Sequence, residues 1–133
     1  MKGFSKTNAV TVTVLAVALM LCGQLLYAAQ HAAQPAKEVT LEGEVLDMYC
    51  FMKHPETGQG PEHAKCAKTC MEKGLPIGYL TKDGTVYLLI GKDHESAAKM
   101  VADYAGKASI LTGTVVEHHG VKAIEIASIK PAK

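Results

Sequence analysis

Downstream of residue 38 the chain carries short runs in which apolar residues alternate with polar ones, a pattern typical of β-strands with one buried face. In residues 39–49, for example, Val39, Leu41 and Val45 lie at even spacing. Further runs rich in β-branched or aromatic residues predict strands at residues 77–81, 85–90, 109–117 and 121–129. The pattern therefore predicts five short strands.

Turn-forming residues join four of these strands in pairs. Asp83 and Gly84 lie between the second and third strands and are a strong short-range signal for a β-hairpin. His118, His119 and Gly120 separate the last two strands in the same way. We therefore expect one hairpin in the middle of the chain and another at its end.

Two helices are predicted between the strands. Pro61 opens the first, at residues 61–73, and Gly74 follows it, which is the usual placement of proline and glycine at helix ends. Asp93 is expected to cap the second helix, and Gly106 to end it in a left-handed conformation. On a helical projection one side of the first helix carries most of its sulfur, and we expect that side to point inward.

Five short strands, with a helix between the third and fourth, follow the order found in the five-stranded Greek-key barrel called the OB-fold. Gly43 in the first strand and Gly113 in the fourth are placed where a barrel strand must bend. The fold class that we predict is mainly β with two helices, arranged as an OB-fold-like Greek-key barrel.

The first residues have the composition of a secretory signal peptide. Lys2 and Lys6 precede an apolar run at residues 9–21, and small residues follow as far as Ala28, where cleavage is expected. An uncleaved membrane anchor and lipidation at Cys22 are the alternatives to cleavage. We therefore expect an exported protein of the periplasm or cell envelope.

A chain of 133 residues has room for one domain beyond such a segment. We expect a signal peptide at residues 1–28, a flexible leader at residues 29–38 and a domain at residues 39–130, with a Cys/His-rich loop and helix at residues 47–76. Its 14 basic residues, all lysine, nearly balance its 13 acidic residues, so no basic stripe for nucleic acid is expected.

Three cysteines lie in the predicted domain, namely Cys50, Cys66 and Cys70. In an oxidising compartment paired thiols become disulfides, and an odd number leaves one thiol free, bound to a metal or joined to another molecule. Helical spacing places His63, Cys66 and Cys70 in one stripe, where a single cation can touch all three. Cys50, at the predicted end of the first strand, is the candidate fourth ligand of a site typical of zinc.

Methionine broadens the choice of metal, because soft thiolate and thioether ligands favour Cu(I). Met48 and Met52 alternate with Cys50 along the predicted strand, and Met71 lies beside Cys70. Ordinary core packing is the alternative role for each methionine. Copper and zinc are therefore both candidates for the bound ion.

Two further residues, Asp47 and His54, are considered as secondary members of the site. Asp47 is placed to orient His63 or another ligand by a hydrogen bond, or simply to cap the end of the strand. His54, in the loop, is a substitute for His63. His118 and His119 occupy a turn with no cysteine nearby in the sequence, which favours an ordinary exposed position.

Two other interpretations of the cysteines stay open. A disulfide from Cys50 to Cys66 or Cys70 would stabilise a small barrel by about 2 to 4 kcal/mol and leave one buried thiol. Cys66 and Cys70 can also pair across one helical turn, where a strained bond is easily reduced and suits thiol redox chemistry. Motifs of hydrolases and nucleotide-binding proteins are absent from the sequence.

The segments "GEVLDMYC", "HAKCAKTC", "GLPIGYL" and "LTGTVVEHHGVKAIEIASI" resemble parts of small exported bacterial proteins of OB-like architecture and unknown function. The resemblance covers residues 39–129, and its specific part is the pattern D-x-x-C followed by H-x-x-C-x-x-x-C. It implies the barrel and export rather than an activity.

The leading hypothesis is a non-enzymatic, exported protein that holds copper or zinc through Cys50, His63, Cys66 and Cys70, for structure, storage, sensing or delivery. A periplasmic or membrane protein would be its partner in delivery. The alternatives are a periplasmic thiol-redox protein and a disulfide-stapled barrel that binds another ligand.

Overall fold

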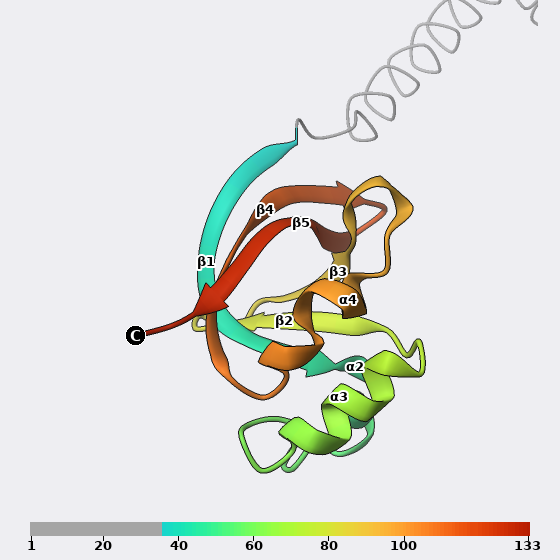
Figure 1. The fold of residues 1–133 in the computed structure, drawn as a ribbon. Helices are drawn as coiled ribbons and strands as arrows, with labels where there is room; N and C mark the ends of the chain where they lie inside the picture. The colour runs from blue at the N-terminus through green and yellow to red at the C-terminus, as the bar shows by residue number, and fades with distance from the viewer. Residues whose placement is uncertain (1–35) are drawn as a thin grey trace, which may run out of the picture. The chain divides into compact units, whose positions relative to one another are not determined.

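The structure, a computed structural model, describes residues 36–133 (Figure 1). The predicted signal peptide and most of the predicted leader lie outside these residues. The strands are β1 (Lys37–Asp47), β2 (Ile77–Thr81), β3 (Val86–Ile90), β4 (Ala108–His118) and β5 (Val121–Pro131). The helices are α2 (Met48–Lys53), α3 (Ala64–Glu72) and α4 (Ala97–Val101), with short 3₁₀ helices η1 (Lys92–His94) and η2 (Ala102–Tyr104).

The five strands close into a barrel in the order β1-β2-β3-β5-β4. All neighbouring strands are antiparallel except β3 and β5, which run parallel. The predicted hairpins are confirmed, because β2 pairs with β3 and β4 pairs with β5. The mainly β class is confirmed too, although the described part of the chain holds three α-helices where two were predicted.

Strand β1 pairs with two other strands, and Gly43 lies where the pairing changes from β4 to β2. Residues 37–44 pair with β4, and residues 43–47 pair with β2. A Cβ atom at Gly43 would collide with the carbonyl oxygen of Leu80, so this close approach of two strands requires glycine. Gly113 meets the same restriction against β5, beside a register shift in the pairing of β4 with β5. The predicted bends are thus where the barrel closes.

The core contains side chains from the strands and from α3 and α4. Tyr79 is fully buried, and its hydroxyl group lies 2.7 Å from the Ser109 carbonyl oxygen and 3.1 Å from that of Leu41. A tyrosine of β2 therefore bonds to both β1 and β4 from inside the barrel. Val101 of α4 is also fully buried and belongs to the same core cluster.

Several predicted elements differ from the observed ones by a few residues at their ends, and in two places the difference changes the type of structure. The first strand begins at Lys37 and ends at Asp47, and α2 occupies the residues predicted to extend the strand as far as residue 49. The predicted second helix is divided into η1, α4 and η2, and Asp93 has φ 52° inside η1 instead of capping a helix. Gly74 and Gly106 do have positive φ, as expected for residues that end helices.

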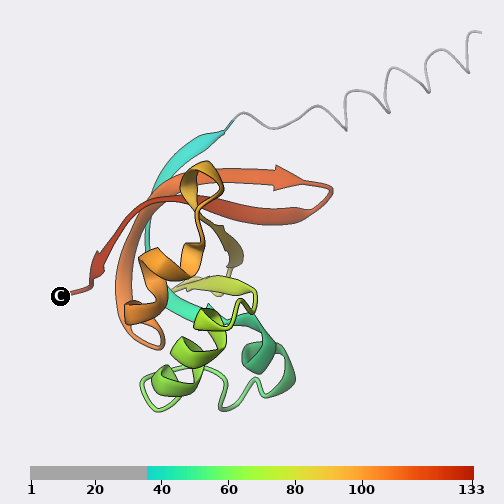
Figure 2. The same ribbon diagram turned by 45° about the vertical axis from the view of Figure 1, so that its right-hand side comes forward.

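Helices α2 and α3 lie side by side at one end of the barrel, next to β2 (Figures 1 and 2). Both belong to the connection between β1 and β2, whose ends are held together where Asp47 pairs with Ile77. No helix among residues 36–133 is long and apolar enough to cross a membrane.

Candidate metal centre

The cysteines occupy the 29-residue connection between β1 and β2, residues 48–76. Its two ends leave neighbouring antiparallel strands, so the connection begins and finishes at the same edge of the barrel. The backbone N–H of Met48, at the start of α2, donates to the carbonyl oxygen of Pro76 at 2.9 Å. The barrel therefore fixes the start of α2 against the chain that follows α3.

Asp47 positions Cys50 by capping α2. Its carboxylate accepts hydrogen bonds from the backbone N–H groups of Tyr49, at 3.1 Å, and Cys50, at 3.3 Å. These donors have no partner within the helix, so the carboxylate stabilises the first turn. Asp47 itself is fully buried. Cys50 consequently lies in a helix and not at the end of a strand, which corrects the prediction for β1.

The loop after α2 supports the same turn from the other side. Gly58 is buried, and a Cβ atom there would come within 2.5 Å of the Cys50 carbonyl oxygen. The backbone N–H of Gly60 donates to the Glu44 side chain at 2.5 Å, which joins the loop to β1. The two glycines are the sequence signal for this close backbone packing.

Helix α3 is oriented by its apolar side. Ala67 and Met71 are 2% and 1% exposed and pack in the core. At the carboxyl end, the N–H of Leu75 donates to the Cys70 carbonyl oxygen at 3.1 Å, and the N–H of Gly74 donates to that of Met71 at 2.9 Å, which is a Schellman motif. The helix is therefore fixed in rotation and at its end.

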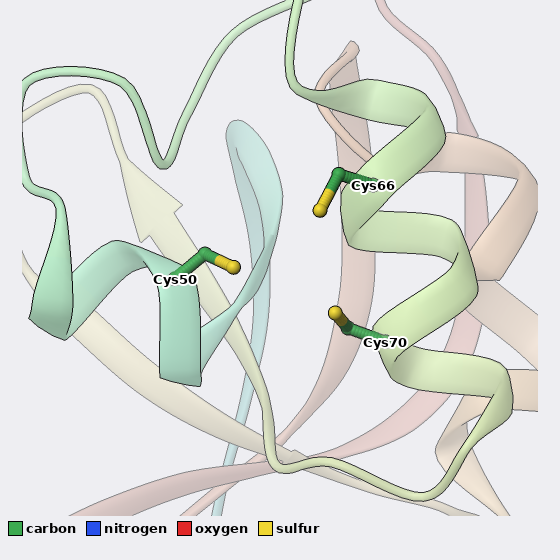
Figure 3. A group of neighbouring side chains, drawn as sticks. All are labelled: Cys50, Cys66 and Cys70. Atoms are coloured by element: carbon green, nitrogen blue, oxygen red, sulfur yellow. The ribbon is translucent and has the colours of Figure 1, made fainter.

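With α3 held in this way, Cys66 and Cys70 point toward α2 and Cys50 points back at them (Figure 3). The three sulfur atoms lie within 4.8 Å of one another. All three cysteines are free thiols, with Cys66 exposed and the other two partly buried. The prediction that the sulfur-bearing side of the helix points inward is confirmed for Met71, which is buried, and is wrong for Cys66, which is exposed.

His63 belongs to a second group that shares only Cys50 with the first. The ligand atoms of Asp47, Cys50 and His63 also lie within 4.8 Å of one another. His63 Nε2 is 3.5 Å from Asp47 Oδ2, and the histidine side chain is 15% exposed. The structure thus brings all four predicted ligands, together with Asp47, into one neighbourhood, as two groups of three that share Cys50.

The buried carboxylate changes the acidity of the thiols beside it. Hydrogen bonding to Asp47, followed by burial and by the negative charge of Asp47, raises the pKa of Cys50 from 9.0 to about 12. Burial, followed by the charge of Asp47, also raises the pKa of Cys70. Both thiols therefore carry their protons at neutral pH in the metal-free protein, and a metal must displace these protons when it binds.

The remaining secondary candidates are placed elsewhere. Met71 is in the core, Met48 packs against Gly78, and Met52 is 69% exposed on α2. Met48 and Met71 therefore pack against other residues, which was the alternative role considered for each methionine. The expected alternation of Met48, Cys50 and Met52 along a strand is wrong, because α2 is helical. His54 is exposed at the carboxyl end of α2.

His118 and His119 lie at the turn between β4 and β5, with their ring centroids 4.3 Å apart and the rings edge to face. Neither histidine belongs to the two groups of potential ligands found among residues 36–133. Both are exposed, as expected for a hairpin turn.

Comparison of the chain with protein-family models, with curated proteins and with solved structures gives no significant match. The chemistry of the site therefore has to be argued from its own residues.

Proposed function

We propose that this chain is an exported protein that binds a soft transition metal, copper or zinc, through Cys50, Cys66 and Cys70, with His63 next to this group. The observation that carries the proposal is the convergence of three thiols from two helices, with all sulfur atoms within 4.8 Å of one another. Thiolate clusters are the ligand type that selects Cu(I) and zinc over harder cations.

The distances suit a bound ion after a small adjustment. Metal–sulfur bonds of about 2.3 Å place the sulfur atoms of a tetrahedral or trigonal site roughly 3.8 to 4.0 Å apart. The thiols lie on two helices that are anchored to the barrel at their ends, so the site is largely formed before the metal arrives. A preformed site supports binding and release of a metal more than a purely structural role, in which folding itself depends on the ion.

We further propose that the barrel is of the OB type, with the metal-binding segment in its first interstrand connection, and that the protein works in the periplasm or cell envelope. The strand order, with parallel pairing of β3 and β5, supports the OB assignment. Support for export comes from the composition of residues 1–28 and from the resemblance to small exported proteins.

Delivery of the metal is the role most consistent with the exposure of the cysteines. Cys66 is exposed, so an incoming donor from a partner protein can reach one ligand of the ion without unfolding the domain. Such ligand exchange is how a metal passes between thiolate sites. A buried site with three inaccessible thiols would favour a structural metal instead.

Thiol redox chemistry is the second candidate, because the same proximity lets Cys50 form a disulfide with Cys66 or Cys70 after a modest rotation of the side chains. The raised pKa of Cys50 weighs against it as the attacking group, since the thiolate is the nucleophile. Cys66 would then have to supply the attacking thiolate.

The direct test is to isolate the exported form without adding metal and to measure its metal content and free thiols on the same sample. One copper or zinc ion per chain, with three reactive thiols after chelation, is the expected result. One free thiol and no metal would establish the disulfide. Three free thiols that take up neither Cu(I) nor Zn(II) when these are added would overturn the proposal.

Cys66→Ser is the matched variant for this test. Cys66 is exposed, so the change removes one thiol with little effect on the packing of the domain. The variant should keep its cooperative unfolding transition and lose its metal. Retention of metal at the wild-type ratio by this variant would show that the bound ion lies elsewhere.

A further inference from the structure

The two groups of ligands differ in which atoms are available to a metal. In the group of cysteines, all three side chains end in free thiols that point at one another. In the other group, Asp47 already accepts hydrogen bonds from two backbone N–H groups of α2 and faces His63. A metal bound by Asp47 would therefore compete with these N–H groups and with His63 for the same two carboxylate oxygens.

His63 is engaged by the same carboxylate. Its Nε2 atom is 3.5 Å from Asp47 Oδ2. His63 belongs to the group with Asp47 and Cys50, and not to the group of Cys50, Cys66 and Cys70. For His63 to complete a tetrahedron with the three thiols, its ring would have to move toward Cys66 and Cys70, because it shares no group of mutually close ligand atoms with them.

Thioether sulfur does not complete the set either. Met71 is 1% exposed among core residues, and Met48 packs against Gly78 of β2. Met52 is 69% exposed, on the same short helix as Cys50 but two residues later, so its side chain leaves the helix about 200° away. Within the described part of the chain, the thiols of Cys50, Cys66 and Cys70 therefore converge without a thioether beside them.

Three thiolates without a fourth ligand suit some metals and not others. Zinc sites in proteins are almost always four-coordinate and tetrahedral when they are structural. Cu(I) is a soft d¹⁰ ion that is stable with three thiolates in a trigonal plane, and thiolate ligands select it. Zinc would need a fourth ligand, such as water, to complete a tetrahedron at these three thiols, whereas Cu(I) would not, so the number of converging donors favours Cu(I).

We propose that the site binds one Cu(I) ion through Cys50, Cys66 and Cys70 alone, and that His63 is a positioning residue that holds Asp47 and, through it, the turn carrying Cys50. This inference rests on the proposed metal-binding function and narrows it to a three-coordinate thiophilic ion. No electron transfer is involved, because copper enters and leaves as Cu(I) and each thiol that binds it gives up its proton to solvent.

The test compares metals and variants in the reduced protein under anaerobic conditions. Cu(I) affinity is measured by competition with the chromogenic chelator bathocuproine disulfonate, and Zn(II) affinity by competition with a zinc-binding dye. We expect Cu(I) to be retained against its chelator by the wild type and by His63→Ala, with a loss of no more than about 10-fold in the variant. Cys66→Ser should lose Cu(I) to the chelator completely.

X-ray absorption at the copper edge supplies a readout that a merely structural effect would not change. Wild type and His63→Ala should both show three sulfur neighbours and no imidazole scattering. An imidazole signal in the wild type that disappears in His63→Ala would overturn the inference. So would tight zinc binding that needs His63 together with weak binding of Cu(I).

The outcomes separate this inference from the proposed function. If the reduced protein binds neither ion, the proposed function itself fails. If it binds zinc with His63 as the fourth ligand, the metal site stands and only the three-coordinate assignment is wrong. Circular dichroism and thermal unfolding of His63→Ala establish that the variant is folded before its affinities are compared.

Discussion

Asp47 is the residue on which the geometry of the site depends, and replacing it gives the most informative perturbation. Asp47→Ala removes the carboxylate that caps α2 and faces His63, while leaving all three cysteines in the chain. Because Asp47 is fully buried at the junction of β1 and α2, the effect should appear both in stability and in metal affinity.

The expected magnitude follows from the hydrogen bonds. Loss of an N-cap costs about 0.5 to 2 kcal/mol and typically ~1 kcal/mol. The backbone N–H groups of Tyr49 and Cys50 lose their acceptor, so we expect a cost of about 1 to 2 kcal/mol. For a domain of this size each kcal/mol lowers the melting temperature by roughly 4 to 8 °C. Without this cap, the first turn of α2 no longer holds Cys50 in place, so the site should also bind Cu(I) about 10- to 100-fold more weakly.

Urea denaturation of the reduced, metal-free protein measures the first effect, and chelator competition measures the second. Asp47→Asn is the matched control, because asparagine is as good an N-cap as aspartate and preserves the size of the side chain. The control should retain most of the stability that Asp47→Ala loses. Equal stability of wild type and Asp47→Ala, or equal losses in the two variants, would refute the assignment of Asp47 as the cap.

Four other outcomes test separate parts of the structure. Under brief alkylation of the metal-free protein, mass spectrometry should find exposed Cys66 modified before Cys50, and the reverse order would contradict the placement of the thiols. Because its pKa is raised to about 12, Cys50 contributes to the free energy of unfolding below pH 9.0, and this contribution should be lost as the pH rises toward about 12. In urea denaturation at several pH values, the free energy of unfolding of Cys50→Ala should therefore fall less over that range than that of the wild type. Gly43→Ala should destabilise the barrel by about 1 to 3 kcal/mol or more, because its methyl group meets the Leu80 carbonyl; unchanged urea denaturation would exclude that contact. Tyr79→Phe should cost about 1 to 2 kcal/mol in the same assay, and a neutral result would mean that its hydroxyl bonds do not hold β1 and β4.

The parts of the fold that sequence predicted are those with local signals. Alternation and turn residues located all five strands, and Gly84, His119 and Gly120 have the positive φ that tight hairpin turns need. The bends at Gly43 and Gly113 were also expected from the pattern. Closure of the barrel between β1 and β4 was inferred only from the order of elements, since strand pairing at long range leaves no local trace.

The position of Cys50 shows where local patterns fail. Residues 48–53 are mostly apolar and too few to display a helical period, so they read as an extension of the strand. The capping carboxylate of Asp47 and the bond from Met48 to Pro76 decide the helical conformation, and the second of these requires the folded barrel. An aspartate directly after an apolar strand was the available signal for a helix start.

The stripe of His63, Cys66 and Cys70 was predicted from spacing alone and lies on or next to α3 as expected. Spacing also placed Ala67 and Met71 on the inward side of this helix, where they are buried, but it could not show that Cys66, at the edge of the same side, would be exposed. Nor could it divide the four predicted ligands into two groups, because that division depends on where a buried Asp47 lies relative to each side chain.

The most direct test of the central claim is an anomalous-scattering map from crystals of the reduced protein loaded with Cu(I). One copper peak, equidistant from the sulfur atoms of Cys50, Cys66 and Cys70, is the predicted result. A map without copper at that point, or electron density joining two of these sulfur atoms in a disulfide while copper lies elsewhere, would contradict the account.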